Sequence, residues 1–153
     1  MSLASDMDVL RSIPLFAKIE PAKLKLLAFT SERLSFMAGD EVCHQGDVGD
    51  AAYIILEGEA DISVDTANGP MTVATLGKND IIGEIAVLCD VPRTATVTAK
   101  TDLETLKVSK ENFFQLITQF PQIAIQVMHE LAERLHNTTQ DLTKARARLA
   151  ELE

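Results

Sequence analysis

A carboxylate and a guanidinium stand nine residues apart in the segment 83–97, GEIAVLCDVPRTATV. Glu84 follows the flexible Gly83, and Arg93 follows Pro92, whose ring stiffens the backbone. Arginine is the side chain best shaped for bidentate contact with phosphate, whereas a carboxylate accepts hydrogen bonds from sugar hydroxyls. The pair therefore predicts a ligand that carries a phosphate and a diol. A surface salt bridge between the same two residues is an equal alternative on these residues alone.

The positions between this pair predict a helical element that would hold them in place. Ile85 to Leu88 is apolar enough to form one buried helical turn. The first backbone amides of such a turn have no partner inside the helix, so they suit an anion.

The residues around the segment predict many short strands from about Arg33 to Val108. Short runs rich in Val, Ile and Thr are separated by Gly-Asp and similar turn dipeptides. Tyr53–Leu56 is continuously apolar, as in a strand buried on both faces, whereas 60–64 alternates as in a strand with one wet face. Further strands are predicted at 71–76, 94–99 and 103–108, with a hairpin tip at 66–70. Strands of this kind favour an antiparallel barrel or jelly roll.

Helices are predicted on both sides of the strands. The segment 6–29 reads as two amphipathic pieces, with Pro14 ending the first and Pro21 opening the second. Its inward positions are predicted at Val9, Leu10, Ile13, Leu24, Leu27 and Ala28. Ser109 is a good N-cap for a helix after the strands, and Pro121 suits the start of a last, long helix.

The last helix carries a heptad pattern. Apolar and small residues recur at alternating steps of three and four, at Met128, Leu131, Leu135, Thr138, Leu142, Ala145, Leu149 and Leu152. A helix of about 30 residues reaches about 45 Å, longer than a domain of this size needs for itself. We therefore expect a homodimer through the 121–152 helix, paired at a two-fold axis.

The composition is that of a globular protein without a basic face. The 153 residues are 46% hydrophobic, and 23 acidic against 14 basic residues give a net charge of −9. This balance argues against direct nucleic-acid binding. No apolar run approaches the roughly 20 residues of a membrane span, and two isolated cysteines form neither a disulfide framework nor a metal site. We expect a cytoplasmic protein.

The turns and the segment together resemble the cyclic-nucleotide-binding domain family. Gly83–Ala86 followed by Pro92–Ala95 is similar to that family's phosphate-binding cassette. The turn frame that precedes it in the family's order is Gly39-Asp40, Gln45-Gly46-Asp47, Tyr53-Ile54-Ile55 and Gly58-Glu59. The resemblance implies an α+β, mainly β fold: an antiparallel β jelly-roll barrel with N-terminal helices and a long C-terminal dimerisation helix. It covers nearly the whole chain as a single domain, 1–153, with helices at 6–29, the barrel at 33–108, the cassette at 83–95 and helices at 109–152.

The resemblance implies roles for residues of the cassette. Glu84 would accept the ribose 2′-hydroxyl, with Gly83 letting the backbone come close, and Arg93 would bind the cyclic phosphate. The full cassette set is Gly83, Glu84, Ile85, Ala86, Arg93, Thr94 and Ala95. Ile82 stands where the family often has phenylalanine, which should alter packing under the ribose more than the chemistry.

The base is predicted to be read by hydroxyl groups, and two positions compete for this role. Thr94 stands where family members that favour cGMP often place a hydroxyl. Residues 134–139 resemble the long helix of bacterial catabolite-activator-type cAMP receptors, in which a hydroxyl pair contacts adenine across the dimer. Thr138 and Thr139 occupy that place, although Thr138 could instead fill a weak heptad position. The prediction leans to cAMP and leaves cGMP open.

The expected function is a receptor or regulatory module without catalysis, metal or cofactor, which converts nucleotide binding into rearrangement of helices for an unknown protein partner. The first alternative is a cupin-like metal-dependent enzyme on a jelly roll, which would need converging histidines. Only His44 lies among the predicted strands, whereas His129 and His136 lie on the long helix. The second alternative is the sensor fragment of a longer transcription factor, channel or kinase.

Overall fold

The computed structural model describes residues 7–8, 10–11, 16–17 and 20–152, without the side chains of Glu84, Ile85 and Gln126. The chain divides into two compact units, residues 1–115 and 116–153, and each is considered by itself.

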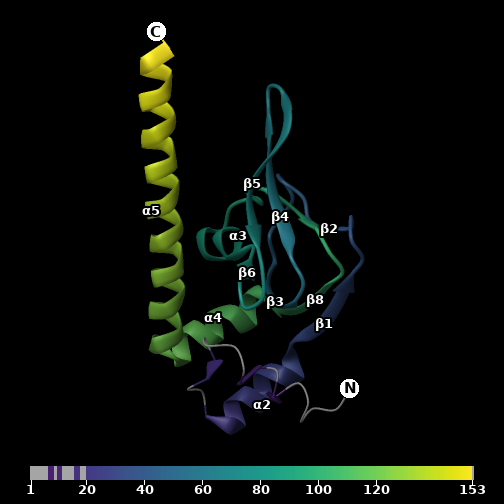
Figure 1. Ribbon diagram of the computed structural model, residues 1–153. Helices are drawn as coiled ribbons and strands as arrows, with labels where there is room; N and C mark the ends of the chain where they lie inside the picture. Colours follow the sequence, from purple (N-terminus) through teal and green to yellow (C-terminus); the bar gives the residue numbers. More distant parts are fainter. Residues whose placement is uncertain (1–6, 9, 12–15, 18–19, 153) are drawn as a thin grey trace. The chain divides into compact units, whose positions relative to one another are not determined.

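Two four-stranded antiparallel sheets form the centre of the first unit (Figure 1). The strands are β1 (Glu32–Phe36), β2 (Glu41–Cys43), β3 (Ala51–Glu57), β4 (Ala60–Thr66), β5 (Gly69–Leu76), β6 (Ile81–Ile82), β7 (Thr96–Ala99) and β8 (Leu103–Ser109). One sheet has the order β1-β8-β3-β6 and the other β2-β7-β4-β5. This confirms the predicted jelly roll, with the refinement that two separate sheets replace a closed barrel.

The predicted difference between the two central strands is present. Six of the seven residues of β3 are buried, and the strand pairs with β8 on one side and β6 on the other. Only the first residue of β4 is buried, because its outer face meets solvent. The two sheets enclose a hydrophobic cluster made of Tyr53, Ile55, Ala60, Leu76, Ile82, Val97, Ala99 and Leu103.

The hairpin of β4 and β5 is tighter than the sequence suggests. Pairing continues to Thr66 opposite Gly69, so the turn consists of residues 67 and 68 alone and not of the whole predicted tip 66–70. Gly69 has φ +101°, a left-handed conformation that glycine adopts without strain. Figure 1 shows this hairpin extending beyond the ends of the other strands.

The helices of the first unit begin near the predicted positions. Helix α2 (Pro21–Thr30) has Pro21 in its first turn and buries Leu24, Leu27 and Ala28, as predicted. Helix α3 (Glu84–Cys89) contains the helical turn predicted at 85–88, in which Ala86 and Val87 are buried and Leu88 is half-buried. Helix α4 (Lys110–Gln119) is capped by Ser109, whose Oγ accepts the Asn112 amide at 3.2 Å.

The predicted first helix is described only in part. Residues 7–8 and 10–11 are helical, and Leu10 is fully buried. Val9, Ile13 and the predicted helix end at Pro14 lie outside the described residues.

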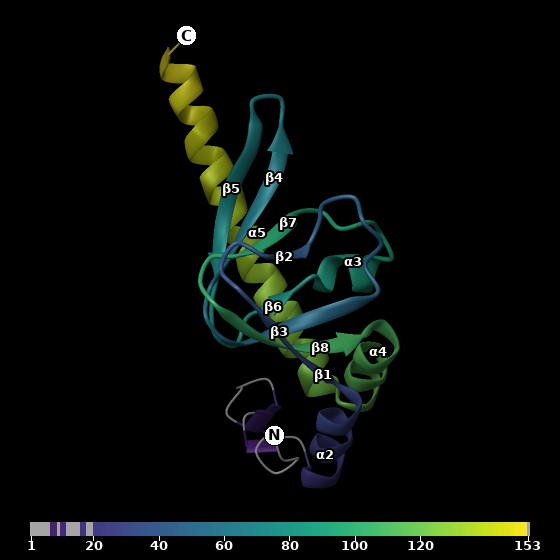
Figure 2. The same cartoon turned by 90° about the vertical axis from the view of Figure 1, so that its right-hand side faces the viewer.

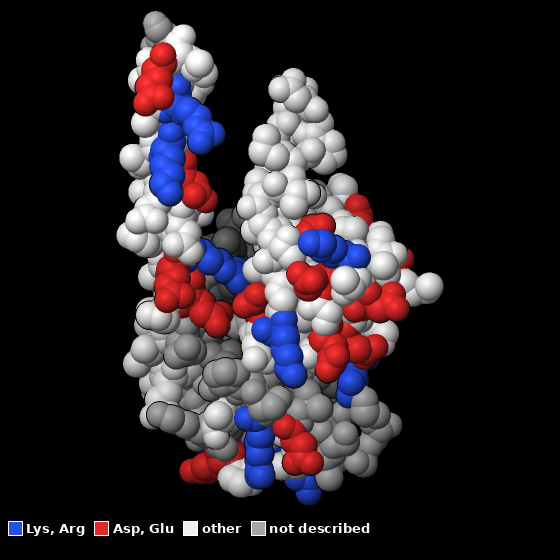
Figure 3. Space-filling view, in the orientation of Figure 1, with Lys and Arg blue, Asp and Glu red and all other residues white. Residues whose placement is uncertain are grey.

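Helix α5 (Pro121–Leu152) is 32 residues long and makes up most of the second unit. Four apolar residues spaced by seven, Met128, Leu135, Leu142 and Leu149, are each between 51% and 69% exposed. Figure 3 shows basic side chains gathered along the C-terminal half of α5, where Lys144, Arg146 and Arg148 lie. In the part of the chain that the structure describes, no helix combines the length and apolar content needed to cross a membrane.

Candidate functional site

The predicted cassette folds as one connected segment between the two sheets. Strand β6 ends at Ile82, Gly83 turns the chain with φ +82°, and α3 follows at once. Helix α3 lies against β3 and ends at Asp90, which is also left-handed with φ +53° (Figure 2). Asp tolerates this conformation better than most residues because its short side chain bonds locally. The chain then runs through Pro92 and Arg93 into β7.

Arg93 is the buried charge of this segment, with only 5% of its surface exposed. Its Nη1 donates to the Gly83 carbonyl oxygen at 3.1 Å, and its Nη2 donates to the Ala51 carbonyl oxygen at 2.8 Å. Arg93 is therefore not a surface residue, and the alternative of a pair with Glu84 concerns a side chain outside the described ones. These two bonds use two of the five N–H donors of the guanidinium.

The chain between β2 and β3 forms hydrogen bonds with both backbone groups of Arg93. The Gly46 amide donates to the Arg93 carbonyl at 2.9 Å, and the Arg93 amide donates to the Asp47 carbonyl at 2.8 Å. A Cβ at Gly49 would collide with the Ala86 side chain and lie 3.3 Å from Arg93 Nε. Glycine at this position therefore lets the loop close against the arginine.

The other predicted cassette residues surround the same segment. Ala86 is buried in α3, Gly83 and Ala95 are half-buried, and Thr94 is exposed. Glu84 and Ile85 belong to the first turn of α3. Their side chains are not among those that the structure describes, so the roles predicted for them stay predictions. The structure thus brings Gly83, Ala86 and Arg93 together around one guanidinium.

Thr138 and Thr139 belong to the second unit, whereas the cassette belongs to the first. Both are exposed on α5, and the Thr139 carbonyl accepts the Thr143 hydroxyl at 2.9 Å.

Two contacts near Arg93 were not predicted from the sequence. The ring of Tyr53 lies with its centroid 6.0 Å from the guanidinium carbon. The Ala51 carbonyl is a backbone group, and no residue pattern marks it as a partner. The Gly49-Asp50 dipeptide was a signal for a turn, but not for close approach to an arginine.

Charges at the ends of α3 and α4 meet beside the cassette. Lys110 Nζ lies 2.7 Å from Asp90 Oδ1, and this hydrogen bond and the positive charge lower the pKa of Asp90. The Lys110 amide also donates to the Asp50 carbonyl at 2.8 Å. The start of α4 is therefore tied to the residue that ends α3 and to the residue that precedes β3.

Cys43 lies close enough to Arg93 for the charge of the arginine to affect the pKa of its thiol. Burial raises the pKa of the Cys43 thiol, and the arginine lowers it in part. The net effect is upward, which keeps this thiol protonated at neutral pH.

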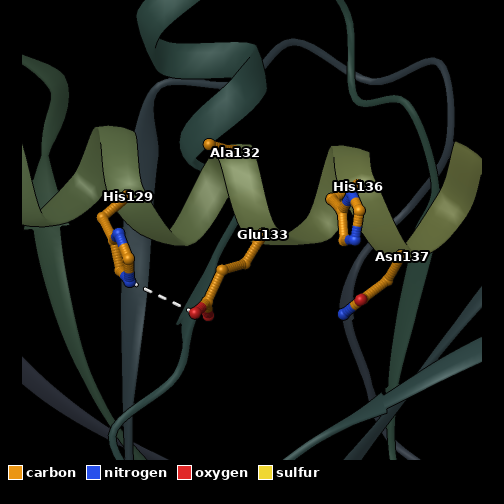
Figure 4. Close-up of a pocket in the computed structure, with 5 residues that line it drawn as sticks. All are labelled: His129, Ala132, Glu133, His136 and Asn137. Atoms are coloured by element: carbon orange, nitrogen blue, oxygen red, sulfur yellow. Dashed lines mark ion pairs between the residues drawn. The ribbon is translucent and has the colours of Figure 1, made fainter.

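A separate hollow of about 460 Å³ lies on α5, lined by His129, Ala132, Glu133, His136 and Asn137 (Figure 4). His129 Nε2 and Glu133 Oε1 are 3.2 Å apart, and both side chains are more than 60% exposed. Among the described residues, no three His, Cys, Asp or Glu side chains are grouped closely enough to hold a metal ion. The converging histidines that a cupin-like site needs are therefore not found in this part of the chain.

The comparisons with known proteins agree with the fold. Residues 33–120 match the family model described as "Cyclic nucleotide-binding domain". The chain is 40% identical over 110 residues to a cAMP-dependent protein kinase regulatory subunit of Eremothecium gossypii, covering 72% of this chain and 23% of that protein. It spans about a quarter of the length of the first kinase regulatory subunits that it matches.

Solved structures share the fold. The catabolite activator protein of Thermus thermophilus is similar with a TM-score of 0.73 and 29% identity, over 84% of this chain and 61% of that one. The regulatory subunit of a cAMP-independent protein kinase A from Trypanosoma brucei, as a triple mutant bound to cAMP in its A site, has a TM-score of 0.73 and 27% identity, over 85% and 47%. This chain belongs to the cyclic nucleotide-binding domain family.

Proposed function

We propose that this chain binds a cyclic nucleotide, with cAMP favoured over cGMP, and acts as a regulatory module without catalysis. The observation that carries the proposal is the burial of the charged Arg93 side chain. A charged guanidinium buried at 5% exposure against neutral carbonyls is costly unless it serves a partner of opposite charge. A cyclic phosphate supplies that charge and can accept bidentate hydrogen bonds from a guanidinium.

The proposed pose follows the cassette residue by residue. Arg93 binds the phosphate, aided by amides near Ala86 and Thr94. Glu84 accepts the ribose 2′-hydroxyl beside Gly83. Ile85 and Ala95 form the remaining parts of the pocket wall around the ligand.

One neighbour offers support at two of these positions. The triple mutant bound to cAMP carries a glutamate-to-alanine change and, seven positions later, a threonine-to-arginine change. In this chain Ala86 and Arg93 also stand seven positions apart. Two of the three residues introduced in that mutant are thus present here at the same spacing, whereas the third, an alanine directly after the arginine, corresponds to Thr94 in this chain.

Calorimetric titration with cAMP and cGMP tests the proposal. Wild type should bind cAMP, and Arg93→Ala should weaken binding by at least 100-fold, because a charge-assisted contact in a buried site contributes several kcal/mol. Arg33→Ala is the matched control, because Arg33 is paired with Glu104 on β8 at 3.3 Å. Equal cAMP affinity for wild type and Arg93→Ala would refute the assignment.

Base reading through α5 is the second part of the proposal. Thr138 and Thr139 would contact the adenine amino group, one of them from a second copy of the chain. A double alanine variant should then lose affinity for cAMP and keep its affinity for cGMP, whose contact would be Thr94. Unchanged cAMP binding would exclude the base-reading role and leave Thr138 as a residue that only occupies a core position of the heptad.

The remaining parts of the proposal concern organisation. We propose that 1–153 acts as one cyclic-nucleotide-binding domain, because the family match at 33–120 crosses the boundary between the two units. The exposed apolar row on α5 supports a homodimer through 121–152. The module would work in the cytoplasm, pass ligand binding to a protein partner, and not contact nucleic acid directly.

A further inference from the structure

We infer that Tyr53 is a positioning residue for the anion site: its ring holds the Arg93 guanidinium in the orientation that receives a phosphate. This inference rests on the proposed function, because it assigns a role in the same site. Of the three described groups that contact the guanidinium, two are backbone carbonyls and one is the Tyr53 ring. Only the ring can be removed by substitution.

All three groups lie on one β ladder or directly next to it. Ala51 and Tyr53 are two residues apart on β3, and Tyr53 is paired with Ile82 of β6. Gly83, whose carbonyl accepts Nη1, follows Ile82 directly. The pairing of two buried strands therefore sets the distances among the three contacts before any ligand arrives.

The Tyr53 ring is itself buried and packs against a second ring. Tyr53 is 8% exposed, and the Phe36 ring meets it edge-on with centroids 6.4 Å apart and an angle of 77° between planes. Edge-to-face pairs of this kind are favourable and limit ring rotation. The face that Tyr53 presents to Arg93 is therefore constant, and a guanidinium over an aromatic face is attracted by the ring quadrupole.

The consequence for binding is preorganisation. An arginine has many rotamers, and ordering such a side chain at the moment of binding costs about 0.5–1.5 kcal/mol. A ring that orders Arg93 beforehand removes that cost from phosphate binding, while leaving contacts with sugar and base unaffected. Tyr53 should thus act on the phosphate part of the affinity alone.

The test compares cAMP with adenosine, which lacks the phosphate, by calorimetric titration of Tyr53→Phe and Tyr53→Leu. Tyr53→Phe keeps the ring and should bind cAMP like wild type. Tyr53→Leu should weaken cAMP binding about 2- to 10-fold, the range that the ordering cost predicts. Its affinity for adenosine should stay within a factor of two. Phe113→Leu is the matched control, because it removes a buried aromatic ring from α4 and no described interaction joins Phe113 to Tyr53 or Arg93.

A second series keeps the shape of the core in case Tyr53→Leu fails to fold. Phenylalanines with increasing numbers of ring fluorines at position 53 weaken the quadrupole at nearly constant volume. Affinity for cAMP should fall stepwise along the series in wild type and stay flat in an Arg93→Ala background. The Arg93 Nε–H resonance of the ligand-free protein should shift along the same series.

The outcomes separate the two proposals. Wild type that binds no cyclic nucleotide would reject the proposed function and, with it, the role of Tyr53. Binding by wild type with equal cAMP affinity across the fluorinated series would reject the positioning role alone. So would a Tyr53→Leu variant that loses cAMP and adenosine by the same factor.

Discussion

Arg93 is a structural residue before it meets any ligand. Its guanidinium joins the Gly83 carbonyl to the Ala51 carbonyl, so it ties the start of α3 to β3. Arg93→Ala should therefore lower the free energy of unfolding of the ligand-free protein by about 2–4 kcal/mol, because one buried and one half-buried carbonyl lose their donor. Urea unfolding followed by circular dichroism measures this loss.

The surface arginine Arg33 provides the reference for that measurement. It is paired with Glu104 at 3.3 Å, and both side chains are about a third exposed, so Arg33→Ala should cost less than about 1 kcal/mol. A ligand-free Arg93→Ala variant as stable as Arg33→Ala would show that the two carbonyl contacts contribute nothing.

Gly83 makes the position of Arg93 possible. It is left-handed with φ +82°, and a Cβ there would collide with Arg93 Nη1. Gly83→Ala should therefore displace the guanidinium and cost about 3 kcal/mol, of which about 1 kcal/mol is the strain of a left-handed alanine. Thermal unfolding of Gly83→Ala in the wild-type and Arg93→Ala backgrounds measures both parts.

Gly69→Ala is the matched control for Gly83→Ala. Gly69 is also left-handed, with φ +101°, but a Cβ there meets no atom within 4 Å. It should cost only the strain, about 1 kcal/mol. If Gly83→Ala costs no more than Gly69→Ala, the close approach of Arg93 is without consequence.

The sequence predicts that Arg93 and Gly83 are important, because their residue types suit an anion site and a close backbone approach. It does not predict which groups these two residues contact. The Ala51 carbonyl is 42 residues away from Arg93 in the chain, and every residue has such a carbonyl. The sequence therefore indicates which charge the site uses, but not what holds that charge without a ligand.

At the scale of elements, one ion pair links the cassette helix to the helix that leads toward α5. Asp90 caps α3 and Lys110 opens α4, and the hydrogen bond from Lys110 lowers the pKa of Asp90. Because the folded-state pKa is lowered, the pair stabilises the protein above the ordinary carboxylate range and is lost as pH falls through the lowered value. Lys110→Met should raise the Asp90 pKa toward its ordinary value.

An NMR titration of the Asp90 carboxyl carbon checks this prediction in wild type and Lys110→Met. Lys107→Met removes a nearby lysine on β8 that is not in contact with Asp90 in any described interaction, so the pKa of Asp90 should stay lowered. An Asp90 pKa that does not move in Lys110→Met would remove the link between α3 and α4.

Elements with a strong pattern could be predicted, and very short ones could not. The apolar run of β3 and the alternation of β4 appear in the sequence because each strand is seven residues long. Strand β6 has only two residues, which is too short for any alternation, yet its pairing with β3 places Gly83. The order of strands in each sheet also depends on long-range pairing, which no local pattern encodes.

At the scale of the whole molecule, the exposed row on α5 is the strongest reason to expect a second copy. Met128, Leu135, Leu142 and Leu149 repeat every seven residues, and each is at least half exposed. A helix of 32 residues is about 48 Å long, and a seven-residue repeat over this length matches the seam of a two-stranded coiled coil. Leaving such a row in water forgoes burial of four large side chains, each of which contributes about 1.5–3 kcal/mol when fully buried.

Leu142→Glu should therefore convert a dimer into a monomer, because two glutamates would face each other across the seam. Gln140→Glu is the matched control, since it adds the same charge two residues away, at a position outside the heptad row. Sedimentation equilibrium at several concentrations should give the mass of two chains for wild type and Gln140→Glu, and of one chain for Leu142→Glu. If Thr138 and Thr139 read the base across the dimer, Leu142→Glu should also weaken cAMP binding while Arg93 stays intact. A monomeric wild type would refute the homodimer through α5. It would also refute base reading by Thr138 and Thr139 across the dimer, and the apolar row would then have to bind a different partner.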